Sequence, residues 1–258
     1  MCRYSLIAIF FWSTTLIAQQ TGSDPTAIAL AQKSVSVLTG GTVISDVTLS
    51  GNVISMLTND TDTGTAIFEA KGQQESLVTL RLTSGNRLEA RNGRLGMPGG
   101  AWAFGGKAST RMAQHNTWTD SAWFFPALSS LSQTTNPQFI FSYLGQEQHN
   151  GLPSQHIRVF QLPPPGMANS PVSALSTMDF YLDVNSYLPL AVAFNQHADD
   201  NIGTNIPAEI RFANYRLVQG AQIPFHFQKL LNGDLVLDVT VTGALLNTGL
   251  LDGIFNLL

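Results

Sequence analysis

The segment 178–247 constrains the fold of this 258-residue chain more than any other part of it. Short runs of apolar and aromatic residues alternate there with pairs of turn-forming residues, such as Gln219-Gly220 and Asn232-Gly233. Runs of this length between such turns predict consecutive antiparallel strands. We expect the strands at residues 178–182, 188–195, 206–217, 223–230 and 235–246. The rest of the chain should be organised around this rolled-up antiparallel meander.

The composition restricts the possible partners. Charged residues make up only 12% of the chain, about half of the usual share in soluble proteins. The formal net charge of −4, from 13 basic and 17 acidic residues, gives no electrostatic basis for following a phosphate backbone. We therefore expect no nucleic-acid partner. The length suits one β-rich domain, which we place at residues 19–258.

The N-terminus is typical of a secretory signal peptide. Arg3 precedes an apolar run at residues 6–12 that is too short to cross a bilayer comfortably, and Ala18 offers a cleavage site. We expect residues 1–18 to be removed on export; the alternative is an uncleaved anchor. Cys2 is the only cysteine, so the mature chain would contain neither a disulfide nor a cysteine-bearing metal site.

A helix should precede the first strands. Asp24 can cap it, Pro25 suits its first position and Gly40-Gly41 can end it. Its apolar stripe should pack on the meander, and that stripe consists of Ile28, Ala31, Val35 and Leu38.

Side-chain patterns also predict the register of two hairpins. Four strands are expected at residues 43–56, 64–70, 76–83 and 87–92. A three-residue loop at 84–86 would set Leu80 opposite Ala90, which sorts apolar and charged side chains onto different faces. In the meander, a three-residue loop at 231–233 would set Phe227 opposite Leu237 and bring His226 to face Asp238.

The middle of the chain is less regular. The glycine-rich segment 93–106 is either a flexible crossing loop or a short, closely approached strand. The aromatic segment 115–131 predicts two short helices broken near Phe125, because Thr119 or Asp120 can cap the first and Pro126 can start the second. A hairpin around Asn150-Gly151 should follow.

Catalytic and metal-binding patterns are weak. The spacings of the five histidines do not indicate a metal site; the turn at Asn150-Gly151, for example, would set His149 opposite Leu152 and His156 opposite Gly145, so that the two rings do not meet. The nucleophile pattern Gly-x-Ser-x-Gly does not occur. The sequence therefore predicts no catalytic residue, no metal ligand and no cofactor. The five histidines are His115, His149, His156, His197 and His226.

The aromatic segment carries most of the functional content. Trp118, Trp123, Phe124 and Phe125 lie within eight positions. They either fill the core between helices and sheet, as large aromatic residues usually do, or they also line an apolar cavity on the concave side of a curved sheet, where a lipid chain could lie. Both interpretations stay open.

Several segments of the sequence resemble segments of the LolA-like superfamily of outer-membrane lipoprotein carriers and sorting proteins. They are Asp24-Pro25 with its helix, Val78-Thr79-Leu80-Arg81-Leu82, the central aromatic helices, Phe180-Tyr181-Leu182-Asp183 with Tyr187-Leu188-Pro189, Ile223-Pro224-Phe225, and Leu245-Leu246-Asn247 to Phe255. The chain is also similar to a group of exported acidobacterial proteins, in Trp118-Thr119-Asp120, Ala122-Trp123-Phe124-Phe125-Pro126 and Glu209-Ile210-Arg211-Phe212-Ala213-Asn214-Tyr215.

This resemblance implies a mainly β fold: a strongly curved, unclosed antiparallel half-barrel with the N-terminal helix and short central helices on its concave side. It implies a hydrophobic cavity for acyl chains and no chemistry. A ligand-contacting arginine of the family could correspond to Arg81, Arg91, Arg158 or Arg211.

The leading hypothesis is an exported, periplasmic, non-enzymatic protein that binds a lipid, an acyl chain or a lipid-anchored partner in this cavity. Peripheral contact with the envelope would be compatible with this hypothesis. The alternative is a structural or protein-interaction module of the envelope with a filled core; an enzyme would need a buried polar cluster in the cavity. The predicted cavity wall consists of Trp118, Trp123, Phe124, Phe125 and Leu128.

Overall fold

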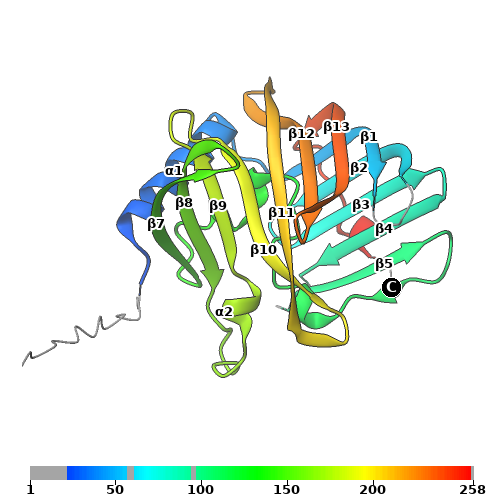
Figure 1. Ribbon diagram of the computed structural model, residues 1–258, viewed down its shortest axis with the longest axis horizontal. Helices are drawn as coiled ribbons and strands as arrows, with labels where there is room; N and C mark the ends of the chain where they lie inside the picture. The colour runs from blue at the N-terminus through cyan, green and yellow to red at the C-terminus, as the bar shows by residue number, and fades with distance from the viewer. Residues whose placement is uncertain (1–21, 57–60, 94–96, 257–258) are drawn as a thin grey trace, which may run out of the picture.

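A computed structural model describes residues 22–56, 61–93 and 97–256 of the chain, so the expected signal peptide at residues 1–18 lies outside the described part. The described strands form one 13-stranded antiparallel sheet in the order β6-β5-β4-β3-β2-β1-β13-β12-β11-β10-β9-β8-β7 (Figure 1). Their bounds are β1 Asp46–Ser55, β2 Asp62–Lys71, β3 Glu75–Leu82, β4 Gly85–Asn92, β5 Gly99–Phe104, β6 Thr110–Arg111, β7 Phe139–His149, β8 Leu152–Gln161, β9 Met178–Asp183, β10 Pro189–Ala198, β11 Asn201–Val218, β12 Ala221–Leu231 and β13 Asp234–Leu246.

The sheet is strongly curved and does not close, which confirms the predicted half-barrel. The five expected segments of the meander become β9 to β13 in consecutive order. β13 then pairs with β1, from the other end of the domain, with Val47 opposite Leu246. Gly51 lies at a bulge in this pair, where a Cβ atom would stand 2.4 Å from the Thr240 carbonyl oxygen. A larger residue there would force the two strands apart.

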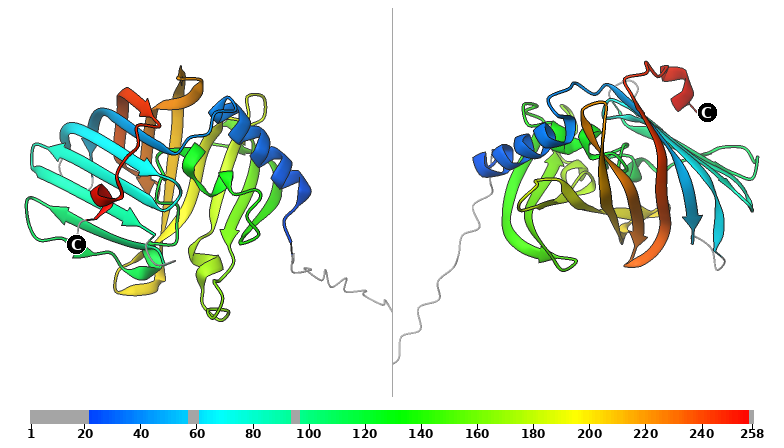
Figure 2. Two further views of the ribbon diagram at one scale, coloured as in Figure 1. Left: turned by 180° about the vertical axis from the view of Figure 1, so that it is seen from behind. Right: turned by 90° about the horizontal axis from the view of Figure 1, so that it is seen from above.

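Helices occupy the concave side. In the right-hand view of Figure 2, the sheet curves around the central segment, and α1 (Pro25–Thr39) lies across the open side. As expected, Asp24 caps α1 by accepting a hydrogen bond from the Thr26 amide, and Gly40 ends it with a φ of 59°. Ala31 and Leu38 are buried where α1 meets β12 of the meander. The remaining helices are short: α2 Val172–Leu175, η2 Gln114–Asn116, η3 Pro126–Leu128, η4 Ser130–Ser132 and η5 Asp252–Phe255.

Aromatic rings form the centre of the core. The ring of Phe68 on β2 lies 5.0 Å from that of Phe227 on β12, 5.1 Å from that of Phe124 and 6.0 Å from that of Trp123. Most of these contacts are edge-on or tilted, the arrangements that aromatic pairs prefer. The central segment is therefore held between the two walls of the half-barrel.

The predicted central helices are replaced by shorter elements. The segment forms turns up to Phe125 and then the three-residue helices η3 and η4, with Pro126 starting η3. Asp120 does not cap a helix; its carboxylate accepts hydrogen bonds from the amide and hydroxyl of Ser130 and ties the segment into a compact loop. The glycine-rich segment forms strand β5, so the second of its two expected alternatives holds for residues 99–104.

The predicted register of β3 and β4 is wrong. Leu80 lies opposite Arg87, not Ala90, because the turn has two residues between the strands instead of three. Asp62, from the start of β2, fixes this tighter turn by accepting hydrogen bonds from the backbone and side chains of Thr83 and Ser84. Shifting the register by an odd number of residues exchanges the faces of a strand. The charged residues of β4 therefore share the concave face with Leu80.

The predicted register of β12 and β13 is also wrong. Phe227 lies opposite Val239 instead of Leu237, because the turn consists of Asn232 and Gly233 alone and a bulge follows it in the strand pair. Both turn residues have positive φ, 52° and 87°, as the favoured two-residue hairpin requires. A bulge between Lys229 and Leu230 adjusts the register. The contact of His226 with Asp238 is nevertheless confirmed, at 3.0 Å between Nε2 and Oδ1.

Candidate functional site

A cleft of about 390 Å³ lies on the concave face, between the wall of β3 and β4 and the wall of β12 and β13. Two different kinds of side chain line it. Its apolar surface comes from both walls and from the central segment. The apolar residues that matter here are Val78, Leu80, Trp102, Trp123, Ile206 and Leu237.

One end of the cleft is fastened by η2. Asn116 of η2 donates a side-chain hydrogen bond to the carbonyl oxygen of His197 at 2.8 Å and accepts one from the His197 amide at 2.8 Å. His115 Nε2 lies 2.9 Å from the carbonyl oxygen of Ala198. These contacts join η2 to the tip of the β10–β11 hairpin, and both lie together at the lower edge of Figure 1. Side-chain hydrogen bonds thus hold the backbone in place at this end of the cleft.

Charged side chains form the second part of the lining. Arg87, Glu89 and Arg91 enter the cleft from β4 because of the two-residue turn after β3. The Arg91 side chain is only 3% exposed, and its Nη1 donates hydrogen bonds to the carbonyl oxygen and the hydroxyl of Thr119, at 3.0 and 3.2 Å. Its Nε has no hydrogen-bond partner among the residues that the structure describes and lies 3.8 Å from Glu89 Oε1. Burial lowers the pKa of Arg91.

Lys229 reaches the same cleft from β12, beside the bulge. Its Nζ lies 4.8 Å from the centre of the Trp123 ring, within the range of a cation–π interaction. Burial lowers the pKa of Lys229, and the positive charges of Arg91 and Arg87 lower it further against the opposing effect of Glu89. Within the described part of the chain, neither the Lys229 nor the Arg87 side chain makes a hydrogen bond or a close ion pair.

The five residues of the predicted cavity wall have different surroundings. Trp123 lines the cleft, while Trp118 packs with Val172 and Leu175 in a separate small cluster. The other three are buried in the core and do not line the cleft; they are Phe124, Phe125 and Leu128. Whether any of the five contacts a ligand stays a prediction.

Sequence reasoning missed the charged lining. Glu89 and Arg87 were assigned no role, because the expected register turned Glu89 away from the apolar face. Arg91 was only one of four candidate arginines. No local signal in the sequence reveals them, because Asp62, which fixes the Thr83-Ser84 turn, lies 21 residues before Thr83.

Asp120 should make stability depend on pH. Burial raises the pKa of Asp120 to about 6, against the hydrogen bonds from Ser130 and the charge of Arg91. Because the folded-state pKa lies above the usual 3.8, this group stabilises the fold fully below pH 3.8 and loses that contribution as the pH rises through 6. The full shift corresponds to about 3 kcal/mol, and partial exposure should reduce it to about 2 kcal/mol.

The measurement is urea unfolding of the wild type and Asp120→Asn between pH 4 and 7. The amide does not titrate, so the free energy of unfolding of the wild type, relative to the variant, should fall as the pH rises. Parallel curves for the two proteins would show that Asp120 has an ordinary pKa in the fold.

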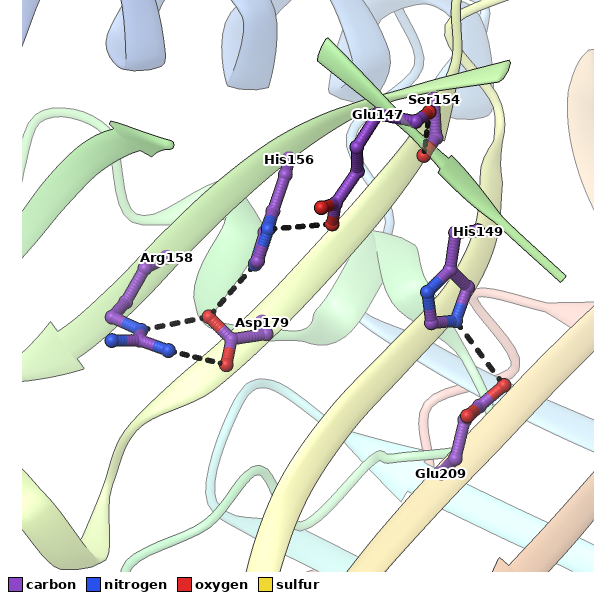
Figure 3. Close-up of polar contacts among 7 residues, drawn as sticks. All are labelled: Glu147, His149, Ser154, His156, Arg158, Asp179 and Glu209. Carbon is purple, nitrogen blue, oxygen red and sulfur yellow. Dashed lines mark hydrogen bonds and ion pairs between the residues drawn. The ribbon is translucent and has the colours of Figure 1, made fainter. Parts of the chain in front are cut away.

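A second polar cluster lies on the outer face of the sheet (Figure 3). Asp179 on β9 accepts two hydrogen bonds from Arg158, at 2.8 and 2.9 Å, and its Oδ1 lies 3.1 Å from His156 Nε2. The Nδ1 atom of the same histidine lies 2.9 Å from Glu147 Oε1. Burial alone would raise the pKa of Asp179, but the hydrogen bonds from His156 and Arg158 outweigh it and lower the pKa.

The cluster continues across β10 to β11. His149 stacks on the Tyr181 ring at 3.5 Å, and its Nε2 lies 3.3 Å from Glu209 Oε1. Glu209 also accepts hydrogen bonds from Asn150 and Arg211, at 2.6 and 2.7 Å. Among the described residues, no group of three or more His, Cys, Asp or Glu side chains could hold a metal ion. The cluster therefore ties the β7–β8 hairpin to the rest of the sheet.

Solved structures show the same fold. A domain of an outer membrane lipoprotein-sorting protein from Vibrio parahaemolyticus has a TM-score of 0.57 at 15% identity, covering 90% of this chain and 96% of that chain. A DUF1329 family protein from Desulfovibrio piger has a TM-score of 0.56 at 10% identity, covering 92% and 98%. No family model matches the sequence, and no curated protein matches it.

The molecule is thus an unclosed half-barrel with a partly charged cleft on its concave face. It shares its fold with these two solved structures, and the predicted half-barrel architecture is confirmed. The likeness to the acidobacterial group stays a prediction. Among the described helices, none is both long and apolar enough to cross a membrane.

Proposed function

We propose that this protein binds a lipid, an acyl chain or a lipid-anchored partner in the concave cleft and carries out no reaction on it. The main support for this proposal is the size of the cleft. Its volume of about 390 Å³ falls within the range of ligand pockets, roughly 300 to 1,000 Å³. Val78, Leu80 and Leu237 give it apolar walls on both sides. The shared fold with the lipoprotein-sorting protein domain from Vibrio parahaemolyticus supports the same class of ligand.

The site of action in this proposal is the periplasm. The N-terminal pattern supports it, with residues 1–18 as the signal peptide and 19–258 as a single mature domain. A half-barrel that shields an acyl chain from water is useful where lipids cross an aqueous compartment, because exposing each buried CH₂ group to water costs about 0.8 kcal/mol. N-terminal sequencing of the exported protein tests this step, and a chain that still begins at Met1 would contradict it.

Native mass spectrometry of the exported protein, together with titration of a dansyl-labelled long-chain fatty acid, tests the binding. Ile206→Trp should fill the cleft that Ile206 lines and weaken probe binding about tenfold, or by 1.4 kcal/mol. Ile202→Trp is the matched control, since Ile202 lies on the same strand, is 45% exposed and does not line the cleft. Co-purified lipid in the wild type and the control, but less in Ile206→Trp, is the expected result.

The alternative, a protein-interaction module, has one observation in its favour. Phe124 and Phe125 are almost completely buried, so much of the concave side is filled by the chain itself. If neither co-purified lipid nor probe binding is detected, and Ile206→Trp behaves like Ile202→Trp, the interaction module is the better description.

A further inference from the structure

The charged part of the cleft contains more positive than negative groups where β4 faces β12. Arg87, Arg91 and Lys229 interact there, with Glu89 as the carboxylate among them. Asp199 also lines the cleft, but it lies on the β10–β11 hairpin and accepts a hydrogen bond from Asn116 at 3.1 Å. Asp120, which interacts with Arg91 from the central segment, already accepts a hydrogen bond from the Ser130 amide.

Two of the three cations have no polar side-chain partner within the described ranges. Arg91 has a structural contact with Thr119, but the side chains of Lys229 and Arg87 have no hydrogen bond or close ion pair with any residue of the described ranges. Charged side chains that are removed from water are normally paired, because desolvation is costly. Two half-buried cations that face one apolar cleft therefore lack the anion that would balance them.

The neighbouring surface restricts what kind of anion fits. Lys229 lies over the Trp123 ring, and apolar side chains continue from it along both walls, including Leu80 and Leu237. A small hydrophilic anion would leave these walls in contact with water. An anion joined to a hydrocarbon chain would cover them and pair the cations together.

We propose that the ligand is an anionic amphiphile whose carboxylate or phosphate group is bound by Lys229 and Arg87, while its chain lies along the apolar walls. Glu89 orients Arg91 and keeps the site selective for groups of low charge, because it repels a multiply charged anion. This assignment rests on the proposed function and adds the chemistry of the headgroup to it.

Isothermal titration of the mature chain with four compounds tests this assignment. They are a long-chain fatty acid, the alcohol and the trimethylammonium salt of the same chain length, and inorganic phosphate. The acid should bind about tenfold more tightly than the alcohol, since one charge-assisted contact is of this order. The trimethylammonium salt should bind more weakly than the alcohol, and phosphate alone should not bind measurably.

Two variants separate the headgroup from the chain. Lys229→Met keeps an unbranched side chain of nearly the same length and removes its charge, so it should abolish most of the preference for the acid and weaken binding of the acid about tenfold more than binding of the alcohol. Lys33→Met is the matched control, because Lys33 is an exposed residue of α1 outside the cleft. It should change neither affinity. Urea unfolding of both variants shows whether they are folded.

The outcomes distinguish the two proposals. Equal binding of acid, alcohol and ammonium salt overturns the headgroup assignment and leaves lipid binding intact. Tight binding of phosphate alone shows that the cations bind a free anion, which overturns the amphiphile. If no amphiphile binds the folded wild type, the proposed function fails and this assignment fails with it.

Discussion

Alanine in place of Phe68 should lower the free energy of unfolding by about 4 kcal/mol, the usual cost of removing a fully buried phenylalanine. Phe68 is 0% exposed and contacts three other aromatic residues, Trp123, Phe124 and Phe227. These residues come from both walls and from the central segment, so the void cannot be closed by moving one side chain. Urea unfolding followed by far-ultraviolet circular dichroism measures the effect.

Phe104→Ala is the matched control. Phe104 lies on β5 and is 36% exposed, so its removal should change the free energy of unfolding by less than about 0.5 kcal/mol. A loss below about 2 kcal/mol in Phe68→Ala would mean that the core collapses around the missing ring. The aromatic cluster would then not be the rigid contact between the walls that its geometry indicates.

Asparagine in place of Asp179 should lower the free energy of unfolding by about 3 kcal/mol at pH 7. The Asp179 side chain is 17% exposed, and the change removes the charge that pairs with Arg158 and His156. The loss comes mainly from leaving these groups with a neutral partner, because Arg158 keeps its charge at every accessible pH. Asp200→Asn, in the exposed β10–β11 turn, should have almost no effect.

The effect of Asp179→Asn should disappear in acid. The folded-state pKa of Asp179 is lowered below 3.8, so its contribution is present above pH 3.8 and is lost as the pH falls through the lowered value. This direction is opposite to that of Asp120. If the free energies of unfolding of wild type and variant still differ by the same amount at pH 2, the contribution of Asp179 comes from the packing of its side chain and not from its charge.

The sequence predicted those parts of the fold that local signals determine. Asp24, Pro25 and Gly40 mark the ends of α1 correctly, because capping depends only on residues next to the helix terminus. The hairpin at Asn150-Gly151 has the expected register, with His149 opposite Leu152. Alternating side chains between such turns were sufficient to predict five consecutive strands of the sheet.

Other parts depend on contacts between distant residues. Asp62 determines the turn at Thr83-Ser84 from the previous hairpin, and the charged lining of the cleft follows from that turn. The bulge beside Lys229 leaves no pattern in the sequence that would predict it. The outer cluster likewise joins Glu147, His156 and Asp179 across three strands. The register predictions assumed that apolar residues share one face of the sheet. This assumption fails on the concave face of β4, which carries charged residues, and the candidate site lies on that face.

The pairing of β1 with β13 has a consequence for how the chain folds. Val47 and Leu246 are partners although they come from opposite ends of the described domain, so the centre of the sheet contains its most non-local contact. Non-local pairs form slowly, because the intervening chain must first be brought together. A nascent or incompletely exported chain that lacks β13 would leave the inner edges of β1 and β12 unpaired. Such edges favour aggregation, so the sheet is protected only once β13 has paired with both β1 and β12.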